Sequence, residues 1–299
     1  MGLGTHQKGG GKFRLIRWLV GTAAVLYLAW RLSSDWPAFA ALPLDLGWLG
    51  LSALFFALAL GGQVSAWQWN LRRMGAPLPY LALFRVYFIT NLGRYIPGKV
   101  WSLAGMVAGG QRLGVGAETM STAVMLGLVS SLVSGLGIGG LTALASGHAG
   151  ILSGWFALVP LASLLLLWPP LFRAWMSLAL RLLKKPDAIP PLTGGLLVRS
   201  TLHYALVWCA YAAAVGVLAR AFDAGNTTFW LYFAAFPLAY LAGYAALFVP
   251  GGWGVREGAL VLLAGGGAVA IAVSLAARLL LTFYELGLFA YSIWSWPHD

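Results

Sequence analysis

Two segments decide the fold of this chain: Asn91-Leu-Gly-Arg94-Tyr-Ile-Pro97-Gly98-Lys99-Val-Trp101 and Phe248-Val-Pro250-Gly251-Gly252-Trp-Gly254-Val-Arg256-Glu257-Gly258. Each contains a Pro-Gly step, and each carries charged residues inside otherwise apolar surroundings. Proline removes a backbone hydrogen-bond donor and glycine tolerates unusual dihedral angles, so a Pro-Gly step ends or turns a helix. The sequence therefore predicts two helix breaks, about half a chain apart, with arginine, lysine and glutamate beside them.

The composition is that of a membrane protein. Of 299 residues, 60% are hydrophobic and 9% are charged, whereas soluble domains carry about 25% charged residues. Apolar stretches of about 20 residues, enough to cross a bilayer, recur along the chain. We expect an all-α polytopic membrane protein with about six spanning helices and two broken or re-entrant helical hairpins. The spans are expected near residues 15–31, 46–69, 117–146, 151–172, 200–220 and 268–296, and the Pro-Gly steps interrupt the apolar regions 80–113 and 228–264.

The basic residues predict the orientation of the chain. They precede the first apolar stretch, follow the second, and surround a proline-rich loop at 186–191. Because cytoplasmic loops are enriched in lysine and arginine, we expect these regions and the N-terminus on the cytoplasmic side of the inner or plasma membrane. Residues 1–14 then form a cytoplasmic tail, and residues 15–299 form a single transmembrane domain. The first stretch is interpreted as an uncleaved anchor, because Arg31 and Asp35 precede any small-residue cleavage site.

The two halves of the chain have the same order of apolar units. Residues 15–146 consist of two spans, a broken pair and a span, and residues 151–296 repeat that order. An odd number of crossings in the first half inverts the second, so the two broken pairs enter the membrane from opposite faces. Interrupted segments at matching positions are typical of inverted-repeat transporters, in which they mark the binding site. The alternative is that residues 228–249 simply span the membrane.

Charged residues beside the two breaks are the candidate ligand-binding groups. Each buried charge costs about 2.5–3.5 kcal/mol on insertion scales, and an anionic headgroup such as a phosphate would offset that cost through charge-assisted hydrogen bonds. The helix that restarts near Gly254 also offers free N–H groups to an anion. In the alternative interpretation, Glu257 pairs with Arg94 or Lys99 and holds the two hairpins together. The candidate substrate-binding residues are Asn91, Arg94, Tyr95, Gly98, Lys99, Gly251, Gly252, Trp253, Arg256 and Glu257.

A further charged pair lies in the last apolar segment. Arg278 and Glu285 are seven residues apart, which places them on one helical face, with Thr282 between them. Intramembrane ionisable residues mark transport paths and proton relays. We therefore expect these three side chains to line the path, with Glu285 or Glu257 as a proton-coupling carboxylate. The alternative is that Arg278 reaches toward the membrane interface or pairs internally.

The two Pro-Gly segments resemble the paired motifs of the lysylphosphatidylglycerol synthetase membrane-region family, whose members are flippase-like integral membrane proteins. The resemblance extends over residues 15–296, and the segment from Pro250 to Gly258 is its more specific part. In the family's best-known members a cytoplasmic aminoacyl-transfer domain is joined to this region, which is thought to move the aminoacylated lipid across the bilayer. This chain ends at Asp299 and resembles a stand-alone member. The resemblance implies lipid translocation and leaves open whether the lipid is a phospholipid or a polyprenyl-phosphate-linked lipid.

Other chemistries find little support in the sequence. Cys209 is the sole cysteine and the four histidines show no metal-ligand spacing, so we expect no metal or cofactor. We also expect no nucleic-acid partner, because the basic residues form no soluble module. Two functional classes remain: a non-enzymatic translocase of an anionic membrane lipid that works by alternating access, and a membrane-embedded transferase that uses a polyprenyl-phosphate donor. A transferase needs an exposed acid, for which Asp35, Asp45 and Asp223 are candidates. An accessory role beside a glycosyltransferase or lipid-modifying enzyme is a further alternative. We favour the translocase, because the charges gather at the helix breaks.

Overall fold

Four long helices form the frame of the protein. The computed structural model describes residues 33, 37, 41–95, 100–146, 158, 160–182, 192–222, 228–246 and 249–296, and all regular structure in these residues is helical. The long helices are α3 (Leu46–Arg73), α6 (Ala117–Ala145), α9 (Gly194–Ala221) and α12 (Gly267–Trp294). Each is long and apolar enough to cross a membrane, and they coincide with the spans predicted near 46–69, 117–146, 200–220 and 268–296. The predicted N-terminal tail and the first span lie outside the described residues.

The first predicted break separates two short helices. These are α4 (Tyr80–Asn91), followed by the 3-10 turn η1 (Leu92–Tyr95), and α5 (Val100–Arg112). At 1.5 Å per residue each helix is about 20 Å long, shorter than the ~30 Å hydrocarbon core of a bilayer. α4 and α5 contact each other, so the chain turns back on itself between them. We call α4, η1 and α5 the first broken pair; Pro97 and Gly98 themselves lie outside the described residues.

The second break is built around glycine. It separates α10 (Thr228–Ala245) from α11 (Val255–Leu263), with the 3-10 turn η4 (Pro250–Gly252) between them. Gly251, Gly252 and Gly254 have φ angles of 60°, 68° and 77°, a left-handed region that side chains disfavour. The turn packs α11 back on α10 so closely that a Cβ atom on Gly243 would lie 2.8 Å from the Cβ of Arg256. The predicted break at Pro250-Gly251 is confirmed, and we call α10, η4 and α11 the second broken pair.

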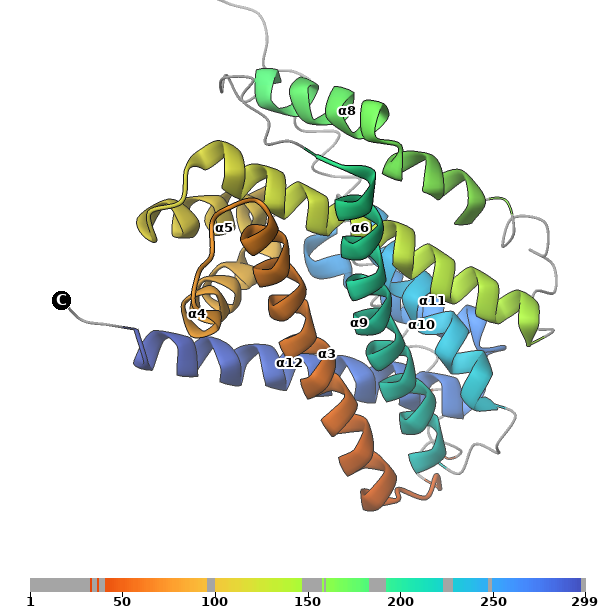
Figure 1. Ribbon diagram of the computed structural model, residues 1–299. Coiled ribbons are helices and arrows are strands. Elements are labelled where there is room, and N and C mark those ends of the chain that lie inside the picture. Colours follow the sequence, from red (N-terminus) through yellow and green to blue (C-terminus); the bar gives the residue numbers. More distant parts are fainter. Residues whose placement is uncertain are drawn as a thin grey trace, which may run out of the picture.

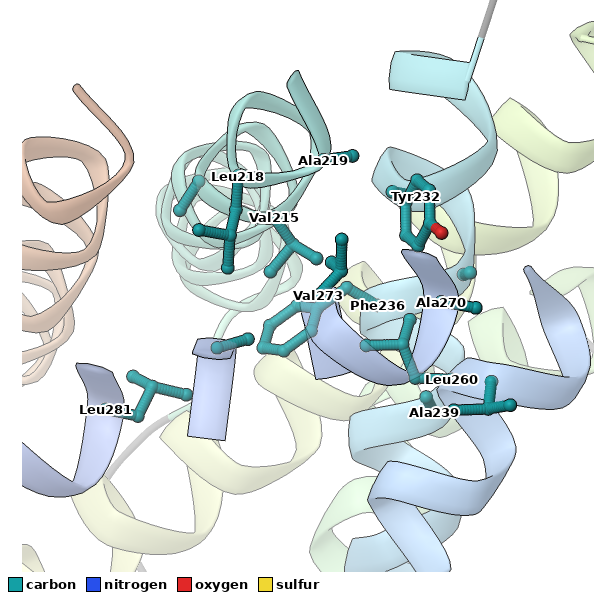
Figure 2. Packing of buried hydrophobic residues seen from close by; sticks show 14 of the residues in the cluster. Val215, Leu218, Ala219, Tyr232, Phe236, Ala239, Leu260, Ala270, Val273 and Leu281 are labelled. Carbon is teal, nitrogen blue, oxygen red and sulfur yellow. The ribbon is translucent and has the colours of Figure 1, made fainter. Parts of the chain in front are cut away.

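Helix α9 lies at the centre of the helix packing. It contacts α3, α6, α10 and α12, and it lies alongside α3 with the opposite direction (Figure 1). The backbone N–H of Asp45 donates to the carbonyl of Ala221 (2.9 Å), so the start of α3 and the end of α9 share one face of the protein. Figure 2 shows Val215 of α9, Phe236 of α10 and Val273 of α12 in one buried hydrophobic cluster. This cluster holds the second broken pair against the long helices.

Glycines on α6 allow α10 and α9 to approach it closely. A Cβ atom on Gly139 would lie 2.7 Å from the Cγ of Leu238, and one on Gly135 would lie 2.8 Å from the ring of Trp208. Small residues at four-residue spacing let the backbones of membrane helices come close together. The contacts of α6 with α10 and α9 therefore depend on the absence of side chains at these two positions.

Helix α12 joins the two broken pairs. It crosses α3 and α9 (Figure 1) and also contacts α4 and α11. Arg85 of α4 donates from Nε to the hydroxyl of Ser295 (3.1 Å), and Arg94 of η1 pairs with Glu285. The order of the partners is reversed between the two segments, so α4 and α12 are antiparallel. The turns η1 and η4 also contact each other, which brings the two breaks together in space.

The span predicted at residues 151–172 is not one continuous helix in its described part. The 3-10 turn η3 (Leu164–Leu167) ends before Trp168, and a separate helix, α8 (Pro169–Leu182), begins directly after it. Proline suits the first turn of a helix, where its missing N–H is not needed, so the Pro169-Pro170 pair starts a new helix. α8 lies along the edge of the bundle (Figure 1), with Phe172 buried in a cluster that includes Leu126 and Leu197. The described residues therefore hold four candidate spans, where about six were expected along the chain.

Candidate functional site

A cavity of about 160 Å³ lies where the broken pairs meet the long helices. One buried water needs about 10–15 Å³, so the cavity has room for a small polar headgroup. Its neutral polar lining includes Gln63, Asn91, Ser102 and Ser131. The charged side chains among its described lining residues are Arg94, Arg256 and Arg278, with no carboxylate among them.

The charged groups lie deep along α12. Arg278 is eleven residues from the first residue of this helix, and Glu285 is nine residues from the last. At 1.5 Å per residue these positions are about 16 Å and about 14 Å from the respective ends. Since the helix is longer than the ~30 Å hydrocarbon core, both side chains fall in its interior part.

Arg94 is held from two sides. Its guanidinium pairs with Glu285 of α12, which is buried, and its Nη1 donates to the hydroxyl of Tyr240 on α10 (3.2 Å). Because Arg94 belongs to the first broken pair, these contacts link that pair to both α10 and α12. Arg278 and Glu285 share a face of α12, as expected. Arg278 pairs with Glu257, whereas Glu285 pairs with Arg94.

Glu257 is the centre of a second group of charges. Its Oε2 accepts from the backbone N–H of Gly254 (2.7 Å), and its Oε1 accepts from Arg256 Nε (3.2 Å) and Arg278 Nη1 (3.4 Å). The predicted pairing of Glu257 with Arg94 is therefore wrong, and the other partner considered for it, Lys99, lies outside the described residues. The turn at Gly254 places Glu257 three residues into α11, where its carboxylate reaches back to the helix start. The N-terminus of α11, which was expected to attract a ligand anion, is occupied in part by this carboxylate.

Arg256 keeps hydrogen-bond donors available to the cavity. The residue is 8% exposed, its Nε is bound by Glu257, and its Cζ lies 5.2 Å from the ring centroid of Tyr240. Its two terminal nitrogens make no hydrogen bond within the described part of the chain. A guanidinium can offer two parallel donors to a carboxylate or phosphate. A buried arginine in this condition has the donors that an anion in the cavity could accept.

Aromatic side chains form much of the remaining wall. Tyr204 and Trp208 lie one turn apart on α9, and Tyr240 and Tyr244 lie one turn apart on α10. Such rings can contact an apolar chain with their faces and a polar group with their edges. The sequence reasoning missed these residues. Their signal is the four-residue spacing, but a chain with 11 tyrosines and 15 tryptophans offers too many such pairs for the spacing to single them out.

The structure gathers many of the predicted site residues around this cavity. Glu257 and Glu285 are buried beside their arginine partners, and Trp253 is half-exposed, with its ring centroid 4.9 Å from the Cζ of Arg278. Gly252 packs against the backbone of Gly243, whereas Thr282 is not among the described lining residues. The predicted residues that line the cavity are Asn91, Arg94, Gly251, Arg256 and Arg278. Gly98, Lys99 and the side chain of Tyr95 lie outside the described part of the structure.

Of the three acids considered for a transferase, the structure describes Asp45 alone. The Oδ1 atom of Asp45 accepts from the backbone N–H groups of Gly47 (2.7 Å) and Trp48 (3.2 Å) and so caps the start of α3. Asp35 and Asp223 lie outside the described residues. Within the described residues, no group of histidine, cysteine or acidic side chains could hold a metal ion.

A comparison with known families covers almost the whole chain. The family model of the lysylphosphatidylglycerol synthase TM region matches residues 15–288. The chain belongs to this family. As a member of the lysylphosphatidylglycerol synthase TM region family, with four helices suited to cross a bilayer among its described residues, it is a multi-pass membrane protein related to lipid handling. The resemblance inferred from the two Pro-Gly segments is thereby confirmed. No individual curated protein is similar enough to count as a match.

Proposed function

We propose that this protein is a lipid translocase that moves an anionic lipid across the membrane, with the headgroup held in the arginine-lined cavity. One observation carries the proposal: Arg256 is buried and charged, and its terminal donors are not used by the described chain. A buried charge with unused donors is unfavourable until a ligand binds it. A phosphate can accept two parallel hydrogen bonds from a guanidinium. In a membrane protein of a lipid-related family, a lipid headgroup is the most direct source of that phosphate.

Alternating access is the mechanism that the helix arrangement supports best. Each broken pair turns back on itself, and the turns η1 and η4 contact each other beside the cavity. In inverted-repeat transporters, interrupted helices of the two halves flank the binding site, and one half moves against the other. We extend this interpretation to pseudo-repeats at 15–146 and 151–296 within a single domain. The Arg94–Glu285 pair is one contact that such a movement would have to break.

The charges also suggest the class of lipid and the setting. A phospholipid or a polyprenyl-phosphate-linked lipid supplies the required anion, while its apolar tail stays in the bilayer. Arg72 and Arg73 end α3, and the positive-inside rule would place that end and the N-terminus on the cytoplasmic side of the inner or plasma membrane. Translocation breaks no covalent bond, so the protein acts without catalysis on a lipid that a glycosyltransferase or lipid-modifying enzyme supplies.

Proteoliposomes test the proposal. Phosphatidylcholine vesicles carry a trace of fluorescent phosphatidylglycerol or, in a second series, fluorescent polyprenyl phosphate, and dithionite bleaches the label in the outer leaflet. Wild-type protein should raise the bleached fraction, and Arg256→Gln should abolish the increase. Arg112→Gln, which removes a positive charge from the exposed end of α5, should transport like the wild type. Equal rates for the wild type and Arg256→Gln with both lipids would refute the proposal.

A further inference from the structure

The two buried glutamates have different kinds of partner. Among the described residues, the carboxylate of Glu257 accepts hydrogen bonds from Gly254, Arg256 and Arg278, all in the second broken pair or α12. Glu285 of α12 pairs with Arg94, which belongs to the first broken pair. Glu257 therefore stabilises the second broken pair and joins it to α12, and Glu285 joins α12 to the first broken pair.

Glu257 helps to fix the orientation of the Arg256 guanidinium relative to the cavity. It accepts a hydrogen bond from Nε (3.2 Å), with no such bond described from the terminal nitrogens, and the Cζ atom lies 5.2 Å from the ring centroid of Tyr240. The same carboxylate holds Nη1 of Arg278 at 3.4 Å. Since Glu257 is not among the described lining residues of the cavity, it acts on a ligand only through these two arginines.

Glu285 binds donors of Arg94 that a phosphate in the cavity would also need. Arg94 lines the cavity, and its guanidinium pairs with the carboxylate of Glu285. A phosphate oxygen that reaches Arg94 has to compete with this carboxylate, because both bind the same donors. Tyr240 binds Arg94 Nη1 at 3.2 Å, so the guanidinium can exchange one anion for the other while it stays anchored to α10.

We propose that Glu285 is an exchangeable counter-ion, which the phosphate of a ligand displaces from Arg94, and that Glu257 is a fixed positioning residue for Arg256 and Arg278. The inference rests on the proposed function, since it requires that the cavity bind an anion. Displacement removes a contact between η1 and α12, so binding of the headgroup releases the first broken pair. This gives the ligand a different affinity for the two conformations, which is the condition for a ligand-driven change.

Glutamate-to-glutamine variants separate the two roles, because glutamine keeps the shape of the side chain and removes its charge. The full chain in detergent micelles is titrated with phosphatidylglycerol, and separately with inorganic phosphate, with native mass spectrometry as the readout. Glu285→Gln should tighten binding about tenfold, because Arg94 loses its competing anion, and Glu257→Gln should weaken it about tenfold, because Arg256 loses its orientation. Glu118→Gln, which removes a carboxylate from the first turn of α6, should leave the affinity unchanged.

Opposite directions of change are the decisive result. If both substitutions only disturbed the structure, both would weaken binding, and that result would overturn the inference. An unchanged affinity in either variant would overturn it as well. Arg256→Gln tests the proposed function independently. Equal binding of phosphatidylglycerol by the wild type and Arg256→Gln defeats the proposed function and the counter-ion exchange together. If Arg256→Gln abolishes binding while the two glutamine variants change in the same direction, only the exchange fails. Binding of inorganic phosphate without phosphatidylglycerol, with opposite changes in the two variants, supports the exchange but removes the lipid from the proposed function.

Discussion

Tyr240 connects the two arginines that come from different broken pairs, and its replacement gives the most specific prediction. Its hydroxyl accepts from Arg94 Nη1 (3.2 Å), while Arg256 Cζ lies 5.2 Å from its ring centroid. Tyr240→Phe removes the hydrogen bond and keeps the ring, whereas Tyr240→Leu removes both. Tyr240→Phe therefore removes only the contact to Arg94, whereas Tyr240→Leu removes the contacts to both Arg94 and Arg256.

The size of each effect follows from the contacts. A hydrogen bond to a charged group contributes about 1.5–3 kcal/mol, and the lower end applies because the Arg94 side chain is 21% exposed and keeps its pair with Glu285. Loss of about 1.5 kcal/mol corresponds to a roughly tenfold weaker binding of a headgroup. The contact between Arg256 and the ring is a cation–π interaction of about 0.5–2 kcal/mol. The Tyr240→Leu variant should therefore bind a headgroup several-fold more weakly than the Tyr240→Phe variant.

Binding of phosphatidylglycerol to the purified chain in micelles measures these effects. Tyr211→Phe is the matched control, because Tyr211 packs beside the same Trp208 (5.9 Å between ring centroids) but is not among the described lining residues. A double-mutant cycle with Arg94→Gln isolates the coupling, since the effects of contacting residues are not additive. Fully additive effects of Tyr240→Phe and Arg94→Gln, or an equal loss in Tyr211→Phe, would refute the reasoning.

Two further predictions concern glycines, and both are measured as unfolding temperatures in detergent. Gly139→Leu should destabilise the protein by about 1–3 kcal/mol through overpacking, because a Cβ atom there would lie 2.7 Å from a side chain of α10, whereas Gly137→Leu should not, since nothing lies within 4 Å of its Cβ position. Gly252→Ala should cost about 1–2 kcal/mol in backbone strain and more through contact, because its φ is +68° and its Cβ atom would lie 2.7 Å from a carbonyl oxygen of α10. Gly258→Ala is the control within α11, with open space at its Cβ position. Equal melting of either variant and its control would contradict the corresponding packing argument.

Local chemistry explains why the breaks and the long helices could be predicted. Apolar stretches of the right length predicted α3, α6, α9 and α12, because a span depends mainly on its own residues. The second break could be placed within a few residues, since the glycines beside Pro250 adopt positive φ angles that other residues avoid. The residues beside the breaks were likewise sound candidates for the cavity, because a charge deep in a membrane protein requires a polar partner.

The ion-pair partners of the charged residues could not be predicted in the same way. If Glu257 served a structural purpose, it was expected to pair with Arg94 or Lys99. Among the described residues its carboxylate binds Arg256 and Arg278 and not Arg94. That outcome depends on the position of α12, which is decided by hydrophobic packing among α9, α10 and α11 rather than by the motif itself. The same limit explains the absence of Tyr240 from the predicted site, since its importance arises only when η1 and α11 approach α10 together.

The segment at 151–172 shows a different limit of sequence reasoning. An average over an apolar window does not register where a helix ends, and Pro169 with Pro170 starts a new helix inside that window. In the described part of the segment, residues 158 and 160–163 are helical, η3 follows them directly, and α8 begins after Trp168. Length and hydropathy identify an apolar segment, whereas the positions of prolines decide how many helices it contains.

The balance of charge explains why both broken pairs contribute an arginine to one cavity. Among the described residues, the site holds Arg94, Arg256 and Arg278 against Glu257 and Glu285, which leaves a surplus of one positive charge. Such a surplus is unfavourable in a site enclosed by apolar helices. A headgroup with a single negative charge removes it, whereas an additional ammonium group on the headgroup would restore it. Because Arg94 and Arg256 lie on different broken pairs, a single headgroup bound to both arginines would contact both pairs at once, as the proposed translocase requires.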